Sequence, residues 1–171
     1  MLILLEGCDK SGKSTLARKL VDEFGAEYVK FSQPKRLPYE EYAEFLAAAI
    51  PSKLYVLDRF MHGELVYGPI YRGKSGLDIV QLMALEKTAS SVHGAAVIYC
   101  RVPSSQVKKK FIEDNEEFTQ AKDIGRIIHA YDCVFEQTIL KVFKYDYTVD
   151  GDAAKLLEDL RTFMLQSKGA A

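Results

Sequence analysis

A glycine-rich segment near the N-terminus constrains the fold of this chain more than any other feature. It has the spacing GxxxxGK[ST], formed by Gly7, Gly12, Lys13 and Ser14. The segment directly follows the apolar run Leu2–Leu5 and opens a stretch of helical periodicity, so it sits where a strand turns into a helix. Glycines there let backbone amides converge, and the helix N-terminus adds unpaired N–H groups. The pattern predicts a phosphate-binding loop; the alternative is a Gly- and Ser-rich turn with a solvated lysine.

Short apolar runs alternate with longer stretches of helical periodicity along the rest of the chain. Strands are expected at Leu2–Leu5, Tyr28–Phe31, Leu54–Leu57, Ala95–Cys100 and Tyr145–Val149. Helices are expected at Ser14–Phe24, Tyr39–Ala49, Phe60–Tyr67, Gly76–Val92, Ser104–Ile112, Ala121–Lys141 and Ala153–Leu165. Because the apolar runs are continuous rather than alternating, they suit parallel strands covered on both faces. The pattern predicts an α/β fold of three layers, with a doubly wound, five-stranded parallel sheet.

The length and composition of the chain indicate one domain. Its 171 residues, 48% of them apolar, are enough for a single core. We expect this domain at residues 1–166, with an acidic lid near 113–120 and a disordered tail at 167–171. The net charge of −1 differs from the strongly positive charge of typical nucleic-acid-binding proteins. The first apolar run is too short to span a membrane. We therefore expect a protein that binds neither nucleic acid nor membrane. The three cysteines lack CxxC spacing, which indicates reduced thiols and a cytoplasmic protein.

The glycine-rich segment also predicts a class of reaction. Lys13 would reach the β- and γ-phosphates of ATP and Ser14 would hold Mg²⁺, while Gly7, Gly12 and Thr15 complete the donor site. A GTPase would need an Asn-Lys-x-Asp stretch, which the sequence lacks, and a motor or AAA-type ATPase usually has a longer chain. Phosphoryl transfer to a small acceptor is therefore favoured. Such transfer needs a second set of cations outside the glycine-rich loop.

A second set of candidate residues follows the third predicted strand. Asp58 and Arg59 would lie at its carboxyl end, where open α/β sheets bind ligands. Asp58 could order the water shell of a metal ion while Arg59 binds the acceptor phosphate; the alternative is a surface ion pair. If a helix begins here, its spacing places four residues on one face, which can line the acceptor pocket: Phe60, Gly63, Glu64 and Tyr67.

Several segments resemble the thymidylate kinase family. LEGCDKSGKST and DRFMHGELVYGPIYRG resemble its P-loop and its DRY segment ending in Arg-Gly, YCRVPSSQV resembles its L-D-V-x-P-E strand and turn, and TVDG resembles its final I-D-A/G stretch. The resemblance implies a P-loop nucleoside monophosphate kinase fold with a short lid. It also implies transfer of the γ-phosphate of Mg-ATP to a dTMP-like deoxynucleoside 5′-monophosphate, and a homodimer. Asp150 and Gly151 would lie near the donor adenine.

The resemblance assigns roles around the acceptor sugar and phosphates. Asp9 matches a carboxylate that contacts the 3′-hydroxyl of the sugar, and Arg59 matches the arginine on the monophosphate. Tyr67 matches a tyrosine under the deoxyribose that leaves no room for a 2′-hydroxyl. Lys10 matches a P-loop arginine that supplies charge to the transition state. Since the presumed lid is acidic, we expect Lys10 to replace lid cations, as a point charge rather than a two-pronged donor.

Further candidates rest on looser matches. Arg72 matches the arginine of Arg-Gly. Arg126 and Tyr131 resemble residues of the helix after the lid, where Arg126 would meet the transferring phosphoryl group; the alternative is a solvated helix face. FSQPKR resembles a family turn, so Lys35 or Arg36 would help to hold the acceptor phosphate. Phe31, which opens this turn, is a further candidate for substrate contact.

The base of the acceptor is not assigned by these motifs. Glu64 stands where the family offers an amide or hydroxyl to the base, and an ionised carboxylate only accepts hydrogen bonds. It would suit the N1–H and N2–H₂ edge of guanine, or an exocyclic amine, better than O4 of thymine. Alternatively, Glu64 turns outward and pairs with Arg72 or Lys74. The small size and shortened base-reading region would suit a viral (phage) deoxynucleotide enzyme.

Two other functions remain open at this level. A deoxynucleoside kinase would need a general base near the 5′-hydroxyl of the sugar, which a monophosphate acceptor does not require. An ATP-binding or DNA-modifying protein would use the same fold for something other than small-molecule transfer, although the near-zero net charge speaks against DNA.

Overall fold

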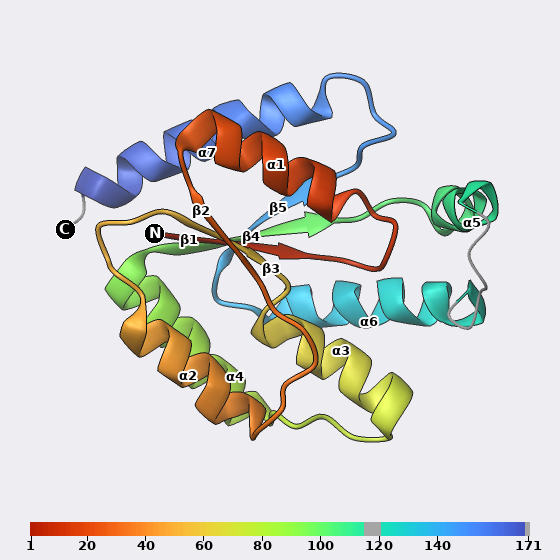
Figure 1. Cartoon of the computed structure of the whole chain (residues 1–171), viewed down its shortest axis with the longest axis horizontal. Coiled ribbons are helices and arrows are strands. Elements are labelled where there is room, and N and C mark those ends of the chain that lie inside the picture. Colours follow the sequence, from red (N-terminus) through yellow and green to blue (C-terminus); the bar gives the residue numbers. More distant parts are fainter. Residues whose placement is uncertain (115–120, 170–171) are drawn as a thin grey trace.

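The computed structural model describes residues 1–114 and 121–169, and its centre is a parallel sheet (Figure 1). The strand order is β2-β3-β1-β4-β5, and every pairing is parallel. The strands are β1 (Leu2–Glu6), β2 (Glu27–Lys30), β3 (Tyr55–Asp58), β4 (Ala95–Cys100) and β5 (Lys141–Tyr145). This confirms the predicted α/β fold with a five-stranded, doubly wound parallel sheet.

Helices cover both faces of the sheet. α1 (Lys13–Phe24) and α7 (Asp152–Gly169) lie on one face, and α2 (Pro38–Ala48), α3 (Met61–Arg72), α4 (Ile79–Thr88) and α6 (Ile124–Gln137) lie on the other (Figure 1). α5 (Ser104–Glu113) lies beyond the end of β4. Short turns of helix, η1 (Ala89–His93) and η2 (Ala121–Asp123), complete the described elements. None of the helices in the described ranges is long and apolar enough to cross a membrane.

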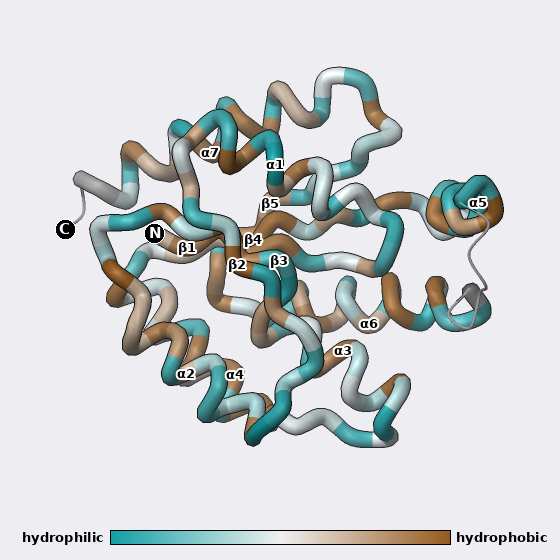
Figure 2. Tube along the Cα trace, viewed as in Figure 1, coloured by the Kyte–Doolittle hydropathy of each residue, from teal (hydrophilic) through white to brown (hydrophobic). Residues whose placement is uncertain are grey.

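The central strands are buried on both faces. All residues of β1 and β4 are buried, and hydrophobic residues predominate along them (Figure 2). One apolar cluster joins Ile3 and Leu5 to α1 and α7, and another joins Leu2 and Leu4 to α2 and α4. Burial on both faces explains why these strands appear in the sequence as continuous apolar runs.

The last predicted strand is wrong by four residues. The structure places β5 at Lys141–Tyr145, where Ala96 pairs with Lys141 and Cys100 pairs with Tyr145, and ends α6 at Gln137. β5 is an edge strand of partly exposed and exposed residues up to Tyr145. Its two lysines, Lys141 and Lys144, interrupt the apolar pattern on which the other strands were recognised. The expected helix therefore ran on to Lys141, and the expected strand began only at Tyr145.

Helix boundaries also differ at several ends. α4 begins at Ile79 rather than at residue 76, because Asp78 and Gln81 form a reciprocal capping box there, and a π-helical turn replaces its last residues. α3 continues to Arg72, beyond the expected end at Tyr67. α7 continues to Gly169, through the first residues of the expected tail. The expected lid lies largely outside the described residues, except for its start at Glu113 and Asp114.

The register of the sheet brings two loops together. Leu5 of β1 pairs with Asp58 of β3, and Lys30 of β2 pairs with the same residue. The carboxyl ends of these strands therefore lie side by side. The glycine-rich loop after β1 and the turn after β3 meet at this edge of the sheet, where ligands of open α/β folds bind.

Candidate active site

The loop from Gly7 to Gly12 has the backbone that its glycines predicted. Gly7 and Gly12 have φ values of 143° and 85°, which side chains rarely allow. A Cβ atom at Gly7 would lie 2.6 Å from the carbonyl oxygen of Cys100, and one at Gly12 would lie 2.9 Å from Cδ1 of Tyr147. Both glycines are therefore required by conformation and by space.

Lys13 is held inside this loop. Its Nζ donates hydrogen bonds to the carbonyl oxygens of Gly7, at 2.9 Å, and Cys8, at 2.6 Å. Burial, and then the positive charge of Arg59, lower the pKa of Lys13 below its ordinary value. Among the described residues, the buried Oγ of Ser11 in the same loop has no hydrogen-bond partner. A bound phosphate would offset the cost of burying this lysine and would offer an acceptor to Ser11.

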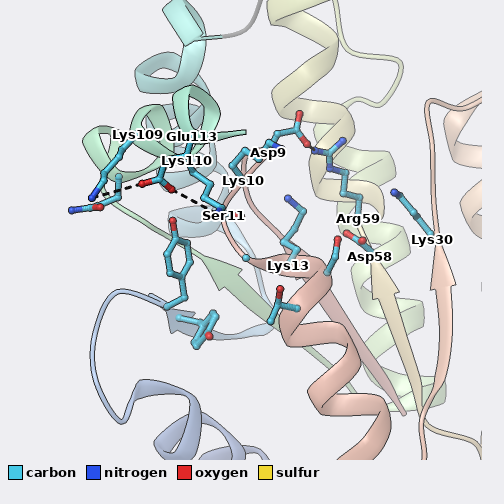
Figure 3. A pocket seen from close by; sticks show the side chains of 16 residues that line it. Asp9, Lys10, Ser11, Lys13, Lys30, Asp58, Arg59, Lys109, Lys110 and Glu113 are labelled. Carbon is cyan, nitrogen blue, oxygen red and sulfur yellow. Dashed lines mark hydrogen bonds and ion pairs between the residues drawn. The ribbon is translucent and has the colours of Figure 1, made fainter. Parts of the chain in front are cut away.

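A cavity of about 650 Å³ surrounds the loop, and we call it the P-loop cavity (Figure 3). Its volume is within the range of small-molecule sites. Its walls come from the loop, β2, β3, α5 and the end of β5. They include the predicted donor residues Gly12, Lys13, Ser14 and Thr15, with Asp9, Lys10, Ser11, Lys30, Asp58, Arg59, Gln106, Lys109, Lys110, Glu113, Tyr145 and Tyr147.

A second cavity of about 380 Å³, the α3 cavity, lies next to the first. It contains the four residues that helical spacing placed on one face, namely Phe60, Gly63, Glu64 and Tyr67. The other lining residues are Asp9, Phe31, Ser32, Gln33, Pro34, Tyr42, Arg59, Tyr71 and Arg72. Asp9 and Arg59 line both cavities, so the two spaces meet at this pair.

Arg59 is held at the junction by its neighbours. Its Nη2 donates to Oδ1 of Asp9 and, at 3.4 Å, to the hydroxyl of Tyr67, and its guanidinium lies 4.9 Å from the centre of the Tyr67 ring. The residue has a φ of 63°, a left-handed conformation that costs free energy for a residue with a side chain. Its buried Nε has no partner among the described residues. This N–H is a donor available to an anion.

Glu6 supports the turn that presents Arg59, and sequence reasoning missed it. Its Oε1 accepts a hydrogen bond from the Phe60 backbone N–H at 2.8 Å, and its Oε2 accepts one from the Tyr131 hydroxyl at 3.0 Å. Glu6 is fully buried, and burial raises the pKa of its carboxyl. A carboxylate at the end of an apolar strand, directly before Gly7, was the signal that could have revealed it.

Glu6→Gln should remove a pH dependence of stability. A carboxyl whose pKa is raised in the folded state stabilises the fold most when protonated, so this contribution is lost as pH rises through the folded-state pKa. We therefore expect Glu6→Gln to gain stability relative to the wild type between pH 5 and pH 8, measured by urea unfolding. The matched control is Glu136→Gln, at an exposed position of α6. A difference that does not change with pH would contradict this assignment.

Asp58 and Ser14 fit a magnesium site of the kind that nucleotide phosphates complete. Both line the P-loop cavity, and Asp58 is buried and accepts a hydrogen bond from the Tyr28 hydroxyl at 2.8 Å. Burial and this bond raise the pKa of Tyr28 to about 12. The described residues contain no group of three or more His, Cys, Asp or Glu residues that would hold a metal ion alone. Mg²⁺ commonly takes one or two protein oxygens plus phosphates, which matches this pair.

Glu64 and Arg72 form an ion pair on the wall of the α3 cavity. Oε1 of Glu64 accepts from Nη2 of Arg72 and, at 2.8 Å, from the backbone N–H of Gly76. One alternative from the sequence was that Glu64 turns outward and pairs with Arg72 or Lys74. The structure has the pair with Arg72, but the Glu64 side chain is buried. Within the described residues its Oε2 makes no hydrogen bond. The pair therefore presents one acceptor and the remaining guanidinium donors.

The first lid residues and α5 bring charges of both signs to the P-loop cavity. Nζ of Lys10 lies 2.8 Å from Oδ2 of Asp114. Lys109 and Lys110 line the cavity from α5, each within 4 Å of Glu113 (Figure 3). Lys109 and Lys110 therefore add positive charge to the cavity that Lys10 also lines, and the role of Lys10 in place of lid cations stays a prediction. Helical periodicity alone does not show where α5 lies, so nothing in the sequence indicated that these lysines line this cavity.

Several predicted site residues do not line either cavity as the structure describes them. Arg126 pairs with Asp123 and its side chain is 66% exposed, and Arg36 pairs with Glu44 and is 57% exposed. Tyr131 is fully buried in an apolar cluster, and its hydroxyl donates a hydrogen bond to Glu6. Asp150 and Gly151 are exposed, while Tyr145 and Tyr147 of the same segment face the cavity. Gly7 does not line the cavity either, but its carbonyl holds Lys13.

Comparisons with known proteins agree with this geometry. No protein-family model matches the chain. The SPbeta prophage-derived uncharacterized protein YorR of Bacillus subtilis (strain 168) is 29% identical over 147 residues, covering 85% of this chain and 88% of YorR. A crystal structure of YorR in complex with phosphorylated GDP matches with a TM-score of 0.81 and 25% identity, over 100% of this chain and 99% of that one. The chain has a P-loop nucleotide-kinase-like fold.

More distant structures support the fold alone. Deoxyadenosine kinase from M. mycoides with bound dATP matches with a TM-score of 0.65 and 15% identity, over 94% of this chain and all of that chain. The same enzyme with the products dCMP and dCDP matches with a TM-score of 0.61, at 16% identity and 95% coverage of this chain. A nucleotide kinase architecture therefore surrounds the two cavities, while the specific resemblance to thymidylate kinases stays a prediction.

Proposed function

We propose that this protein transfers the γ-phosphate of Mg-ATP to the 5′-phosphate of a deoxynucleoside monophosphate. The observation that carries the proposal is the Asp9–Arg59 pair, which lines the P-loop cavity and the α3 cavity at once. A donor in one cavity and an acceptor in the other would meet at a cation. In-line phosphoryl transfer requires this arrangement, because catalysis is mainly positioning and neutralisation of charge.

On the donor side, the amides of the loop and the N-terminus of α1 would bind the phosphates of ATP. Lys13 would exchange its bonds to the Gly7 and Cys8 carbonyls for phosphate oxygens. Ser14 and Asp58 would hold Mg²⁺, which neutralises phosphate charge when bound. Lys10 would neutralise charge near the transferred group, and its ion pair with Asp114 would have to open first.

On the acceptor side, Arg59 would bind the monophosphate through its unpartnered Nε–H. An oxygen of that phosphate attacks the γ-phosphorus, the bond to the bridging oxygen of ATP breaks, and ADP leaves with that oxygen. The products are ADP and a deoxynucleoside diphosphate. The attacking phosphate oxygen is already ionised near neutral pH, so no general base is needed.

The base of the acceptor would meet the Glu64–Arg72 pair. Thymine and guanine each carry a carbonyl oxygen next to a ring N–H, and the pair offers a donor beside an acceptor. Because Oε1 of Glu64 is already bonded to two donors, only Oε2 would accept from the base. The Glu64–Arg72 pair would therefore suit either thymine or guanine.

A deoxynucleoside kinase is the second candidate, favoured by the fold match to deoxyadenosine kinase. It would need a carboxylate free to take the proton of the 5′-hydroxyl. The two carboxylates that line the α3 cavity within the described residues, Asp9 and Glu64, are each bonded to an arginine. This arrangement favours a phosphate acceptor.

One competition experiment tests the proposal. The protein is incubated with Mg-ATP and all four deoxynucleoside monophosphates together with dUMP, and separately with the corresponding nucleosides, and the products are separated by ion-exchange chromatography. We expect diphosphates from one or more monophosphates and none from the nucleosides. Phosphorylation of nucleosides alone would establish the second candidate, and ATP binding without any turnover would favour a protein of another class.

Substitution of Tyr67 should weaken selection for deoxyribose. The ring packs against Arg59 and lines the α3 cavity, where it would leave no room for a 2′-hydroxyl. We expect Tyr67→Ala to reduce the preference for deoxyribonucleotides over ribonucleotides by roughly 10- to 100-fold in kcat/KM. Tyr67→Phe, which keeps the ring, is the matched comparison. Unchanged discrimination in Tyr67→Ala would contradict the role.

The remaining expectations from the sequence analysis stay predictions. They are a homodimer, a cytoplasmic location, a phage origin and the use of Mg²⁺ with ATP.

A further inference from the structure

The two ends of the P-loop cavity differ in what they can bind. One end meets the α3 cavity at Asp9 and Arg59, and the other is bounded by α5 and the segment after β5. In Figure 3, the side chains of Lys109, Lys110 and Glu113 lie on one side of Lys13 and that of Arg59 lies on the other. If the γ-phosphate of a donor faces Arg59, its base must extend toward the opposite end. Two aromatic residues, Tyr145 and Tyr147, line that end.

Tyr147 is fixed on one side and open on the other. Its ring packs against Gly12, where an added Cβ would lie 2.9 Å from Cδ1 and 3.5 Å from Cγ. The same glycine lines the cavity at the start of α1, so the ring stands directly beside the expected phosphate site. Tyr147 is 38% exposed, and among the described residues its hydroxyl makes no hydrogen bond. An aromatic face in this position suits stacking against a base.

The polar groups at the same end do not select one purine. Gln106 offers an amide, which presents a donor and an acceptor and can match either order of groups on a base edge. The carboxylate of Glu113 lies 3.8 Å from Lys109 and 3.7 Å from Lys110, and it can accept from an amino group of adenine or guanine. Recognition at this end would therefore depend on the face of the base more than on its edge.

We propose that Tyr147 is the stacking platform for the base of the phosphoryl donor, and that the site accepts purine nucleoside triphosphates in general, GTP as well as ATP. The proposal rests on the proposed function only in taking the P-loop cavity as the donor site. It also replaces Asp150 and Gly151, which do not line this cavity, as the contacts of the donor base.

The absence of tryptophan from the sequence allows a direct test. Tyr147→Trp introduces a single fluorescent reporter at the proposed platform, which is titrated with Mg-ATP, Mg-GTP and inorganic tripolyphosphate. We expect saturable quenching by ATP and GTP, with midpoints within about threefold of each other, because stacking tolerates different bases. Tripolyphosphate should compete with ATP but should not quench by itself. Phe163→Trp, on α7 outside both cavities, is the matched control and should not respond.

Kinetics of a second variant give an independent test. Tyr147→Ala should raise the KM for ATP by about 5- to 100-fold, the loss expected for one stacked base, with a much smaller change in kcat. Tyr147→Phe keeps the ring and should raise KM far less. Both kinetic constants are measured with the same acceptor. A general loss of folding would lower kcat and the unfolding midpoint, whereas loss of stacking alone would raise the KM for ATP.

The outcomes separate this inference from the proposed function. Equal quenching by tripolyphosphate and ATP, midpoints for ATP and GTP that differ by more than about tenfold, or an unchanged KM in Tyr147→Ala would overturn the inference, even if monophosphates are phosphorylated. Quenching by ATP and GTP but not by tripolyphosphate, without phosphorylation of any monophosphate, would support the inference and contradict the proposed function.

Discussion

Lys13→Ala should abolish most phosphoryl transfer, with kcat lowered by roughly 10²- to 10³-fold, as for the loss of one preorganised charge donor. Lys13 is buried in the loop and bonded to the carbonyls of Gly7 and Cys8, so its charge is already placed where phosphates would bind. Alanine leaves those phosphates without their nearest cation. The measurement is steady-state transfer from ATP to the preferred monophosphate, together with ATP binding by calorimetry.

The matched control for this variant lies on the same helix. Lys19 is exposed on α1 and lines neither cavity, so Lys19→Ala should keep wild-type rates. If Lys13→Ala retains activity within about fivefold of the wild type, less than the effect of one such donor, the P-loop cavity is not the donor site. Unfolding midpoints of both variants separate a lost charge from a lost fold.

Arg59→Lys should have the second largest effect, because the residue joins the two cavities. Its guanidinium contacts Asp9 and Tyr67 at once and keeps a buried Nε–H for a ligand. Lysine is a point charge and cannot make this set of directed bonds. We expect kcat/KM for the monophosphate to fall by about 10²- to 10³-fold, with a rise in the acceptor KM, measured at saturating ATP.

Arg101→Ala provides the control for Arg59→Lys. Arg101 pairs with Asp132 on the surface and lines neither cavity, so its loss should leave acceptor kinetics unchanged. A loss of less than about tenfold in Arg59→Lys, below the cost of one preorganised donor, would mean that the monophosphate is bound elsewhere.

The buried part of the fold was predictable because burial leaves a local pattern. β1 and β4 are covered on both faces, so their apolar runs identified them. The edge strand β5 has no such pattern, since Lys141 and Lys144 are exposed, and it was placed four residues too late. Helix periodicity likewise placed Phe60, Gly63, Glu64 and Tyr67 on one face, and these residues line one cavity.

Site residues far from the glycine-rich motif were harder to predict, because their roles depend on packing between distant elements. Arg126 follows the expected spacing but faces solvent beside Asp123, and Tyr131 turns inward to Glu6. Conversely, Lys109 and Tyr147 line the P-loop cavity without any local motif. A helical period shows which residues share a face, but it does not show what that face meets.

The sequence by itself determined the phosphate-binding loop, the parallel sheet and the strand ends that carry Asp58 and Arg59. Each depends on interactions within a few residues: glycines at positive φ, apolar runs, and a helix that starts where a strand stops. Only the tertiary structure decided that Asp9 and Arg59 close one cavity against another and that Tyr147 packs on Gly12. The physical reason is that these contacts join segments 50 and more residues apart, whose distance is set by the register of the sheet and the packing of its helices.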